Sequence, residues 1–186
     1  MHGFVVLLLL LPVPADLPPT CAAAGLASGA VIRPVGAFTN MRYTEEHAYG
    51  YSVHLWRSGE CLFGLFMASD GLAGDTPAGV LENVRYDPVT GYLLFRARLT
   101  QGEFSDREHN RVASRDVFEF SGTLTRGAIR GSLLHSNALT PARRPIPEKV
   151  ALQKSSGDAQ GMITAKTFAE WEQKVVEILR FRGPRW

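Results

Sequence analysis

Three side chains that could hold a small ligand occupy alternate positions of the segment YSVHLWRSGECLFGLF, residues 51–66. They are Ser52, His54 and Trp56, and alternate residues of a β-strand share one face. Phe63 follows on the return part of the segment, where the expected turn brings it across from His54. An aromatic wall with a few oriented polar groups is typical of a small-molecule site. The pattern predicts these four residues as ligand-binding. The alternative is a half-buried histidine, bonded to the backbone, beside a core tryptophan.

Acidic and histidine side chains offer a second, catalytic interpretation. Asp70 and Asp75 lie in a glycine-rich stretch, residues 68–79, that is typical of a loop, and with His47 and His54 they could form a hydrolase-like site. Their spacing matches neither a helical zinc motif nor an EF-hand, and the sequence has no G-x-S-x-G, G-x-G-x-x-G, P-loop or C-x-x-C motif. We therefore expect no catalytic residue, no metal and no cofactor, and we keep a hydrolase-like enzyme as the alternative.

Composition favours one globular domain without a nucleic-acid partner. The chain has 186 residues, 45% of them hydrophobic, which suffices for one sizeable core. The net charge is only +2, and basic residues gather only at Arg143-Arg144 and in the last residues, RFRGPRW. A nucleic-acid footprint needs a broader basic stripe with exposed aromatic residues.

The first 24 residues have the layout of a secretory signal peptide. An apolar run from Phe4 to Leu11 is followed by a proline and by small residues that end at Ala24. The run is shorter than the roughly 20 residues that span a bilayer, although the stretch before it lacks Lys and Arg. We expect a secreted or periplasmic protein with no stable membrane anchor after processing, whose mature domain is residues 25–186.

The two cysteines depend on where such a signal is cut. Cleavage after Ala24 removes Cys21 and leaves Cys61 as a small buried side chain. Cleavage after Ala15 keeps Cys21 and allows a disulfide with Cys61 in an oxidising compartment. The sequence leaves both alternatives open.

The elements that must position the four ligand-binding candidates begin with a hairpin over residues 51–66. A turn at Ser58-Gly59 would place Trp56 opposite Cys61 and His54 opposite Phe63. Both faces of this hairpin are largely apolar, whereas an antiparallel hairpin usually keeps one face in water. The second face therefore needs a cover: a helix of the same chain, a bound ligand, or a partner.

Two further hairpins carry clear turn signals. One turns at Asp87-Pro88, with Gly91 as its left-handed residue. The other turns at Arg126-Gly127, which places Leu124 opposite Ile129 and Gly122 opposite Gly131 on one face, and Ser121 opposite Ser132 on the other. Together the segments predict a mainly β fold, an antiparallel meander of about eight strands that forms a barrel or barrel-like sandwich.

The hydrophobic period changes at the end of the chain, where residues 165–182 predict one α-helix. Its apolar stripe consists of Phe168, Trp171, Val175, Ile178 and Leu179. Thr167 and Glu170 fit a capping box. Because this stripe must be buried, we expect the helix to dock over the Trp56 face of the first hairpin.

The sequence thus predicts an exported, non-catalytic β-barrel-like domain that binds a small, partly apolar ligand or a component of the cell envelope. A hydrolase-like enzyme and a structural protein-interaction module are the alternatives. The sequence does not determine the oligomeric state.

Overall fold

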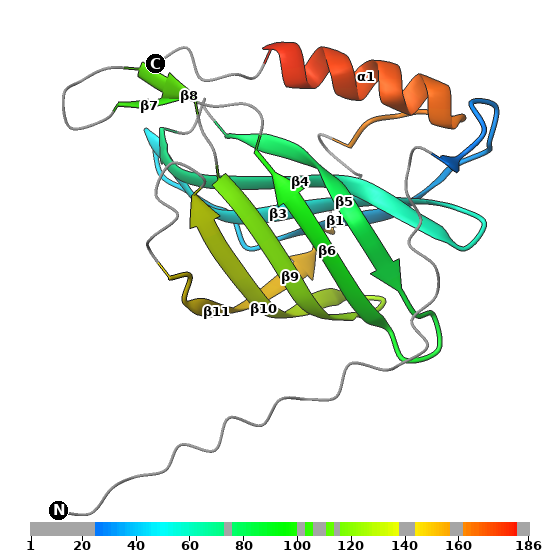
Figure 1. Ribbon diagram of the computed structural model, residues 1–186, viewed down its shortest axis with the longest axis horizontal. Helices are drawn as coiled ribbons and strands as arrows, with labels where there is room; N and C mark the ends of the chain where they lie inside the picture. Colours follow the sequence, from blue (N-terminus) through cyan, green and yellow to red (C-terminus); the bar gives the residue numbers. More distant parts are fainter. Residues whose placement is uncertain are drawn as a thin grey trace, which may run out of the picture.

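The chain folds into a closed β-barrel with one helix on its outside (Figure 1). The computed structural model describes residues 25–72, 76–99, 103–105, 111–113, 116–137, 144–156 and 162–181. The elements are β1 (Arg33–Thr39), β2 (Arg42–Tyr43), β3 (His47–Ser58), β4 (Cys61–Leu72), β5 (Ala78–Tyr86), β6 (Tyr92–Arg98), β7 (Glu103–Ser105), β8 (Arg111–Ala113), β9 (Asp116–Leu124), β10 (Ala128–Asn137), β11 (Pro147–Lys154) and α1 (Phe168–Phe181).

Eight antiparallel strands form the barrel in the order β3, β4, β5, β6, β9, β10, β11 and β1, and β1 pairs again with β3 to close the circle. Strand β2 is an extra strand beside β3, and β7 and β8 form a separate hairpin. Most neighbours in the sheet are also neighbours in sequence, as in an up-and-down barrel. The predicted fold class, a mainly β meander of about eight strands with one C-terminal helix, is confirmed.

The two ends of the barrel differ in their connections. At one end, short turns at residues 59–60, 87–91 and 125–127 join consecutive strands. At the other end lie the chain before β3 and the connections from β4 to β5, from β6 to β9 and from β10 to β11. We call this second end the mouth. Loops on a rigid scaffold carry binding residues more often than tight turns do.

Strands β1 and β11 meet over a short seam. Two residue pairs join them, Phe38 with Lys154 and Thr39 with Gln153. By contrast, β1 pairs with β3 along its whole length, with a bulge between Pro34 and Gly36. Nearer the mouth, the hydroxyl of Tyr51 donates a 2.8 Å hydrogen bond to Glu148, so that a side chain links β3 to β11.

The strand register confirms one predicted hairpin and corrects another. In β9 and β10, Leu124 pairs with Ile129 and Ser121 with Ser132, as predicted. In β3 and β4, Trp56 pairs with Phe63, not with Cys61. The turn residues are 59 and 60 because Gly59, with φ of 57°, takes the first central position, which type II′ turns reserve for glycine. The predicted register therefore differs from the observed one by two residues. Because side chains alternate between faces with a period of two, each residue still lies on the predicted face.

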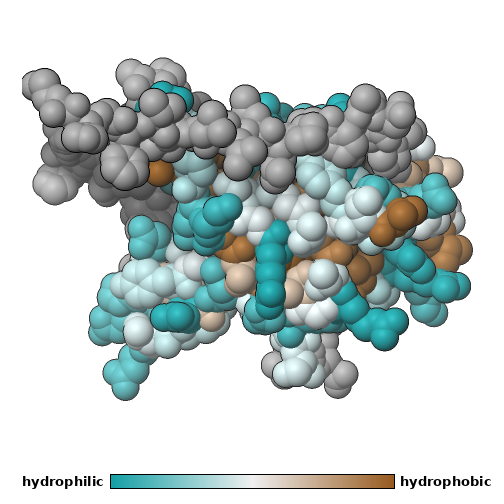
Figure 2. All heavy atoms as spheres, turned by 90° about the horizontal axis from the view of Figure 1, so that it is seen from below, coloured by the Kyte–Doolittle hydropathy of each residue, from teal (hydrophilic) through white to brown (hydrophobic). Residues whose placement is uncertain are grey.

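The barrel interior is filled by side chains. Apolar residues from all eight strands form one buried cluster that includes Phe38, Val53, Phe66, Phe95 and Phe120. Small barrels of this strand number are wide enough for side chains to fill. The outside is mixed: on the face in Figure 2, hydrophobic residues form a strip between hydrophilic side chains.

Helix α1 covers the outer face of the first hairpin. Its Trp171 ring lies 5.7 Å from that of Trp56 and 4.9 Å from that of Phe63, and its Phe168 ring lies 5.3 Å from that of Phe63. These residues form a second buried cluster, separate from the interior, with Ile32, Leu65, Ile163 and Val175. The apolar second face of the hairpin is therefore covered by the chain's own helix.

The start of α1 is held by polar contacts on both sides. The Glu170 amide donates to the Thr167 hydroxyl, as the predicted capping box requires. The Glu170 carboxylate, however, accepts from the amide of Lys166 rather than from that of Thr167. The amides of Phe168 and Ala169 donate to carbonyls of the segment 28–30. The helix begins at Phe168, three residues after the predicted boundary, because Thr167 forms a β-bridge with Val31 and the Lys166 carbonyl accepts from the Ile32 amide.

No described helix is long and apolar enough to cross a bilayer. Cys61, the first residue of β4, is not a free thiol. Cys21 and the whole predicted signal peptide, residues 1–24, lie outside the described residues.

Candidate ligand-binding site

The four sequence-predicted ligand residues share the outer face of the first hairpin, and two of them, Trp56 and Phe63, lie beneath helix α1. Ser52, His54 and Trp56 share the outer face of β3, and Phe63 stands opposite Trp56 on β4. Trp56 and Phe63 are each only 1% exposed and pack on the helix. Ser52 donates a 3.4 Å hydrogen bond to the carbonyl of Phe38. These contacts give the face a packing role, and ligand binding by the four residues stays a prediction.

Of the residues of the enzyme alternative, His47 and Asp70 are diagonal neighbours on the ladder of β3 and β4, and His54 lies further along β3 on the other face. His47 begins β3 and stacks on Tyr49, whereas His54 is buried on the outer face. Asp70 lies in β4, opposite Tyr49, so the predicted loop over 68–79 is wrong in its first part: pairing with β3 extends the ladder to Leu72. Asp75 lies outside the described residues. Among the residues that the structure describes, no three His, Cys, Asp or Glu side chains gather as a metal site.

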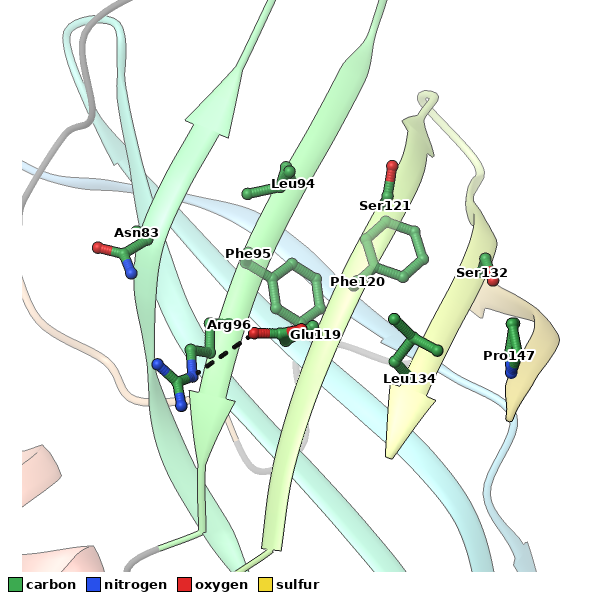
Figure 3. Close-up of a pocket in the computed structure, with 10 residues that line it drawn as sticks. All are labelled: Asn83, Leu94, Phe95, Arg96, Glu119, Phe120, Ser121, Ser132, Leu134 and Pro147. Atoms are coloured by element: carbon green, nitrogen blue, oxygen red, sulfur yellow. Dashed lines mark ion pairs between the residues drawn. The ribbon is translucent and has the colours of Figure 1, made fainter. Parts of the chain in front are cut away.

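A groove on the outside of the barrel lies across β6, β9 and β10 (Figure 3). Its volume is about 450 Å³. It is lined by Asn83, Leu94, Phe95, Arg96, Glu119, Phe120, Ser121, Ser132, Leu134 and Pro147. The interior-facing Phe95 and Phe120 are almost fully buried, so the other eight residues give the groove its accessible side chains. We call this hollow the outer groove.

The outer groove arises where short side chains stand among long ones. Ser121 and Ser132 are a cross-strand pair at its centre. Leu94 pairs with Ser121 from one side, and Leu134 follows Ser132 along β10, two residues on. Pro147 of β11 pairs with Leu134 and extends the apolar wall. Two serines between leucines leave a hollow whose wall is mostly apolar and whose base offers hydroxyl groups.

Arg96 and Glu119 supply the charged part of the outer groove. They are a cross-strand pair, but the Arg96 Nε lies 3.8 Å from the nearest Glu119 oxygen, beyond hydrogen-bond distance. The Nε atom is buried and has no hydrogen-bond partner in the part of the chain that the structure describes. Arg98, two residues on, contrasts with it, since its Nε donates to both Glu82 oxygens at 2.9 and 3.1 Å.

A second constellation of polar residues lines the mouth. Tyr51 donates to Glu148, and Asp116 accepts from Asn137 at 2.9 Å and lies 2.7 Å from the His135 Nε2. The His135 ring stacks at 4.4 Å on Phe118, a residue of the interior cluster. A hollow of about 290 Å³ lies between this histidine, Tyr51 and Glu148. Polar side chains thus close the apolar interior at its loop-rich end.

The surroundings of Tyr51 at the mouth disfavour the ionised form of its hydroxyl. Burial raises the pKa of its hydroxyl above the usual range, and the hydrogen bond to Glu148 and the charges of Glu148 and Asp70 add to the effect. A tyrosine whose pKa is raised by folding contributes stability below its unfolded pKa of about 10. That contribution is lost as the pH rises above about 10.

Tyr51→Phe is therefore expected to change how stability depends on pH. Near pH 7 the variant should lose about 0.5–1.5 kcal/mol of unfolding free energy, because one hydrogen bond is removed. Above pH 10 the stability of the parent should fall more steeply than that of the variant, so the difference between them shrinks. Urea unfolding between pH 7 and 11 measures both slopes. Tyr43→Phe, at an exposed tyrosine, is the control, and equal slopes for parent and Tyr51→Phe would contradict the assignment.

The sequence interpretation missed both the outer groove and the mouth. The mouth could have been found from polar residues near strand ends at positions that alternation points into the barrel. His135, two residues after the inward-facing Leu133, is one of them. The outer groove could have been found from Leu94 and Leu134, two apolar residues at outward-facing positions of strands whose other outward-facing residues are mostly polar.

The fold and the site define a class, a closed eight-stranded antiparallel barrel with a filled interior, an external helix and a groove on its outer wall. No protein-family model matches the chain, and no curated protein or solved structure is detectably similar to it.

Proposed function

We propose that this protein is a non-catalytic binding domain that holds a small, partly apolar molecule in the outer groove. The observation that carries the proposal is the groove itself: about 450 Å³, an apolar wall of leucine and proline, and few polar groups. Ligand sites generally have volumes of about 300–1,000 Å³ and this kind of lining.

Two other surfaces of the barrel support this choice because they are already occupied. The interior holds packed aromatic and aliphatic side chains, unlike the open cup of eight-stranded barrels that carry a small ligand inside. The second face of the first hairpin carries helix α1. We extend the proposal to an exported protein on the strength of residues 1–24, whose pattern is that of a signal peptide.

A neutral amphipathic probe tests the proposal. The full chain is titrated with 1-octanol, and its backbone amide signals are recorded by two-dimensional NMR. We expect the signals of β6, β9 and β10 to shift. Ser132→Phe should fill the hollow and remove these shifts. Thr123→Phe is the matched control, because Thr123 also points outward from this sheet but does not line the groove.

Shifts that are spread evenly over the barrel, or that persist in Ser132→Phe, would contradict a specific site. Shifts confined to β3, β4 and α1 would return the ligand to Ser52, His54, Trp56 and Phe63, the residues that the sequence predicted.

A further inference from the structure

We propose that the ligand of the outer groove is a small amphipathic carboxylic acid, whose carboxylate is held by Arg96 and whose apolar part lies against Leu94 and Leu134. This inference rests on the proposed function and names the chemical class that the groove selects.

The first argument is an unused donor. The Arg96 Nε–H is buried at the groove and has no acceptor among the described residues. Buried donors in proteins are nearly always paired with protein, ordered water or a bound group, so an unpaired donor marks a place where an acceptor can bind. A ligand oxygen in the groove would supply that acceptor.

The second argument concerns which acceptor fits. A guanidinium group presents its N–H bonds as a planar fork, which matches the two oxygens of a carboxylate. Neither neighbouring carboxylate is hydrogen-bonded to this fork, and the ion pair with Glu119 at 3.8 Å is a loose one. Glu82, the partner of Arg96 on β5, is bonded to Arg98, and Glu119 stands beyond hydrogen-bond distance with its side chain 57% exposed. Glu119 can therefore turn toward solvent when an anion arrives.

The third argument is the arrangement of polar and apolar groups. Figure 3 shows Arg96 beside Glu119, with Leu134 and Pro147 across β9 and β10 from it. In the register, Arg96, Glu119, Leu134 and Pro147 form one cross-strand row, and Leu94, Ser121 and Ser132 form the next. A ligand whose charge meets Arg96 can therefore lay its body along the serine row, between Leu94 and Leu134. This layout favours a molecule with one anionic end and a short apolar body over a uniformly polar anion.

The experiment compares three probes that share one chain length: octanoate, 1-octanol and octylamine, each added to the full-length protein below its aggregation concentration. Octanoate is expected to bind about ten- to a hundredfold more tightly than 1-octanol, the effect of one charged hydrogen-bonded contact, and octylamine no better than the alcohol. Affinities come from the NMR shifts of β6, β9 and β10.

Arg96→Gln should abolish the preference for octanoate over 1-octanol. Arg96→Lys, which keeps the charge without the fork, should retain part of the preference. Arg130→Gln is the matched control, because Arg130 is an exposed residue on the same outer wall outside the groove. Arg130→Gln should bind like the parent, which separates a specific contact from general attraction of anions.

Equal binding of octanoate and 1-octanol by the parent protein would overturn the carboxylate assignment and leave the proposed function standing. A preference that survives in Arg96→Gln would also overturn it. If none of the three probes shifts the amide signals of β6, β9 and β10, both the carboxylate assignment and the proposed function are contradicted. The comparison in the parent protein does not depend on whether a variant folds.

Discussion

Trp171→Ala is expected to lower the free energy of unfolding by about 3–5 kcal/mol, the range for removing a large aromatic side chain from a core. Trp171 is 1% exposed, and its ring contacts those of Trp56, Phe63 and Phe168. Its indole N–H has no hydrogen-bond partner within the described part of the chain, so Trp171→Phe should lose much less. Urea unfolding followed by circular dichroism measures both variants. Glu172→Ala, at an exposed position one residue on, is the control.

A double-mutant cycle identifies the face on which the helix is packed. Trp56→Ala alone should also cost about 3–5 kcal/mol, and the pair should be non-additive by about 0.5–3 kcal/mol because the two rings are in contact. An interaction energy near zero would mean that α1 packs elsewhere. A Trp171→Ala variant as stable as the parent would mean that the helix does not contribute to the core.

Gly122→Ala is the second change for which we expect a large effect, about 3 kcal/mol, the upper end of the usual range for an added group that forces the backbone to shift. A Cβ at this position would lie 2.6 Å from the Gly131 Cα and 2.7 Å from the Phe120 ring. It would also collide with the Arg130 carbonyl oxygen, and backbone atoms cannot move aside as a flexible side chain can. Gly122 and Gly131 together make the room that the Phe120 ring occupies inside the barrel.

Gly127→Ala provides the matched control on the same hairpin, since a Cβ there would meet no atom within 4 Å. We expect it to change stability by less than about 1 kcal/mol. Thermal unfolding of the two alanine variants beside the parent gives the comparison. Equal stability of Gly122→Ala and Gly127→Ala would contradict this prediction, because it would show that β9 and β10 can move apart without a loss of unfolding free energy.

Local sequence signals predicted most of the fold because short turns fix their own register. The hairpin of β9 and β10 was predicted pair by pair from one glycine turn, and the stripe from Phe168 to Leu179 predicted the helix. The register of β3 and β4 was wrong by two residues because Ser58-Gly59 and Gly59-Glu60 are both acceptable turns, and only the three-dimensional ladder distinguishes them.

The outer groove could not be predicted in the same way. It depends on Leu94 lying beside Ser121, and the connection from β6 to β9, residues 99–115, carries no register information. It also depends on an irregularity in β5 between Glu82 and Arg85, where Asn83 takes a positive φ of 52°. Arg96 reads in sequence as an ordinary outward-facing charge. That its Nε lacks a hydrogen-bond partner among the described residues becomes visible only once Glu82 is known to bond with Arg98.

The seam between β1 and β11 sets the order in which the molecule can be completed. Its two strands come from opposite ends of the described domain, and the helix that covers the first hairpin follows β11 in the chain. A partly synthesised chain can form the hairpins from β3 to β10 but cannot close the barrel. Such non-local closure is slow to fold, because the entropy of a long loop is lost before the contact forms. A nascent chain therefore stays open at least until β11 has been synthesised.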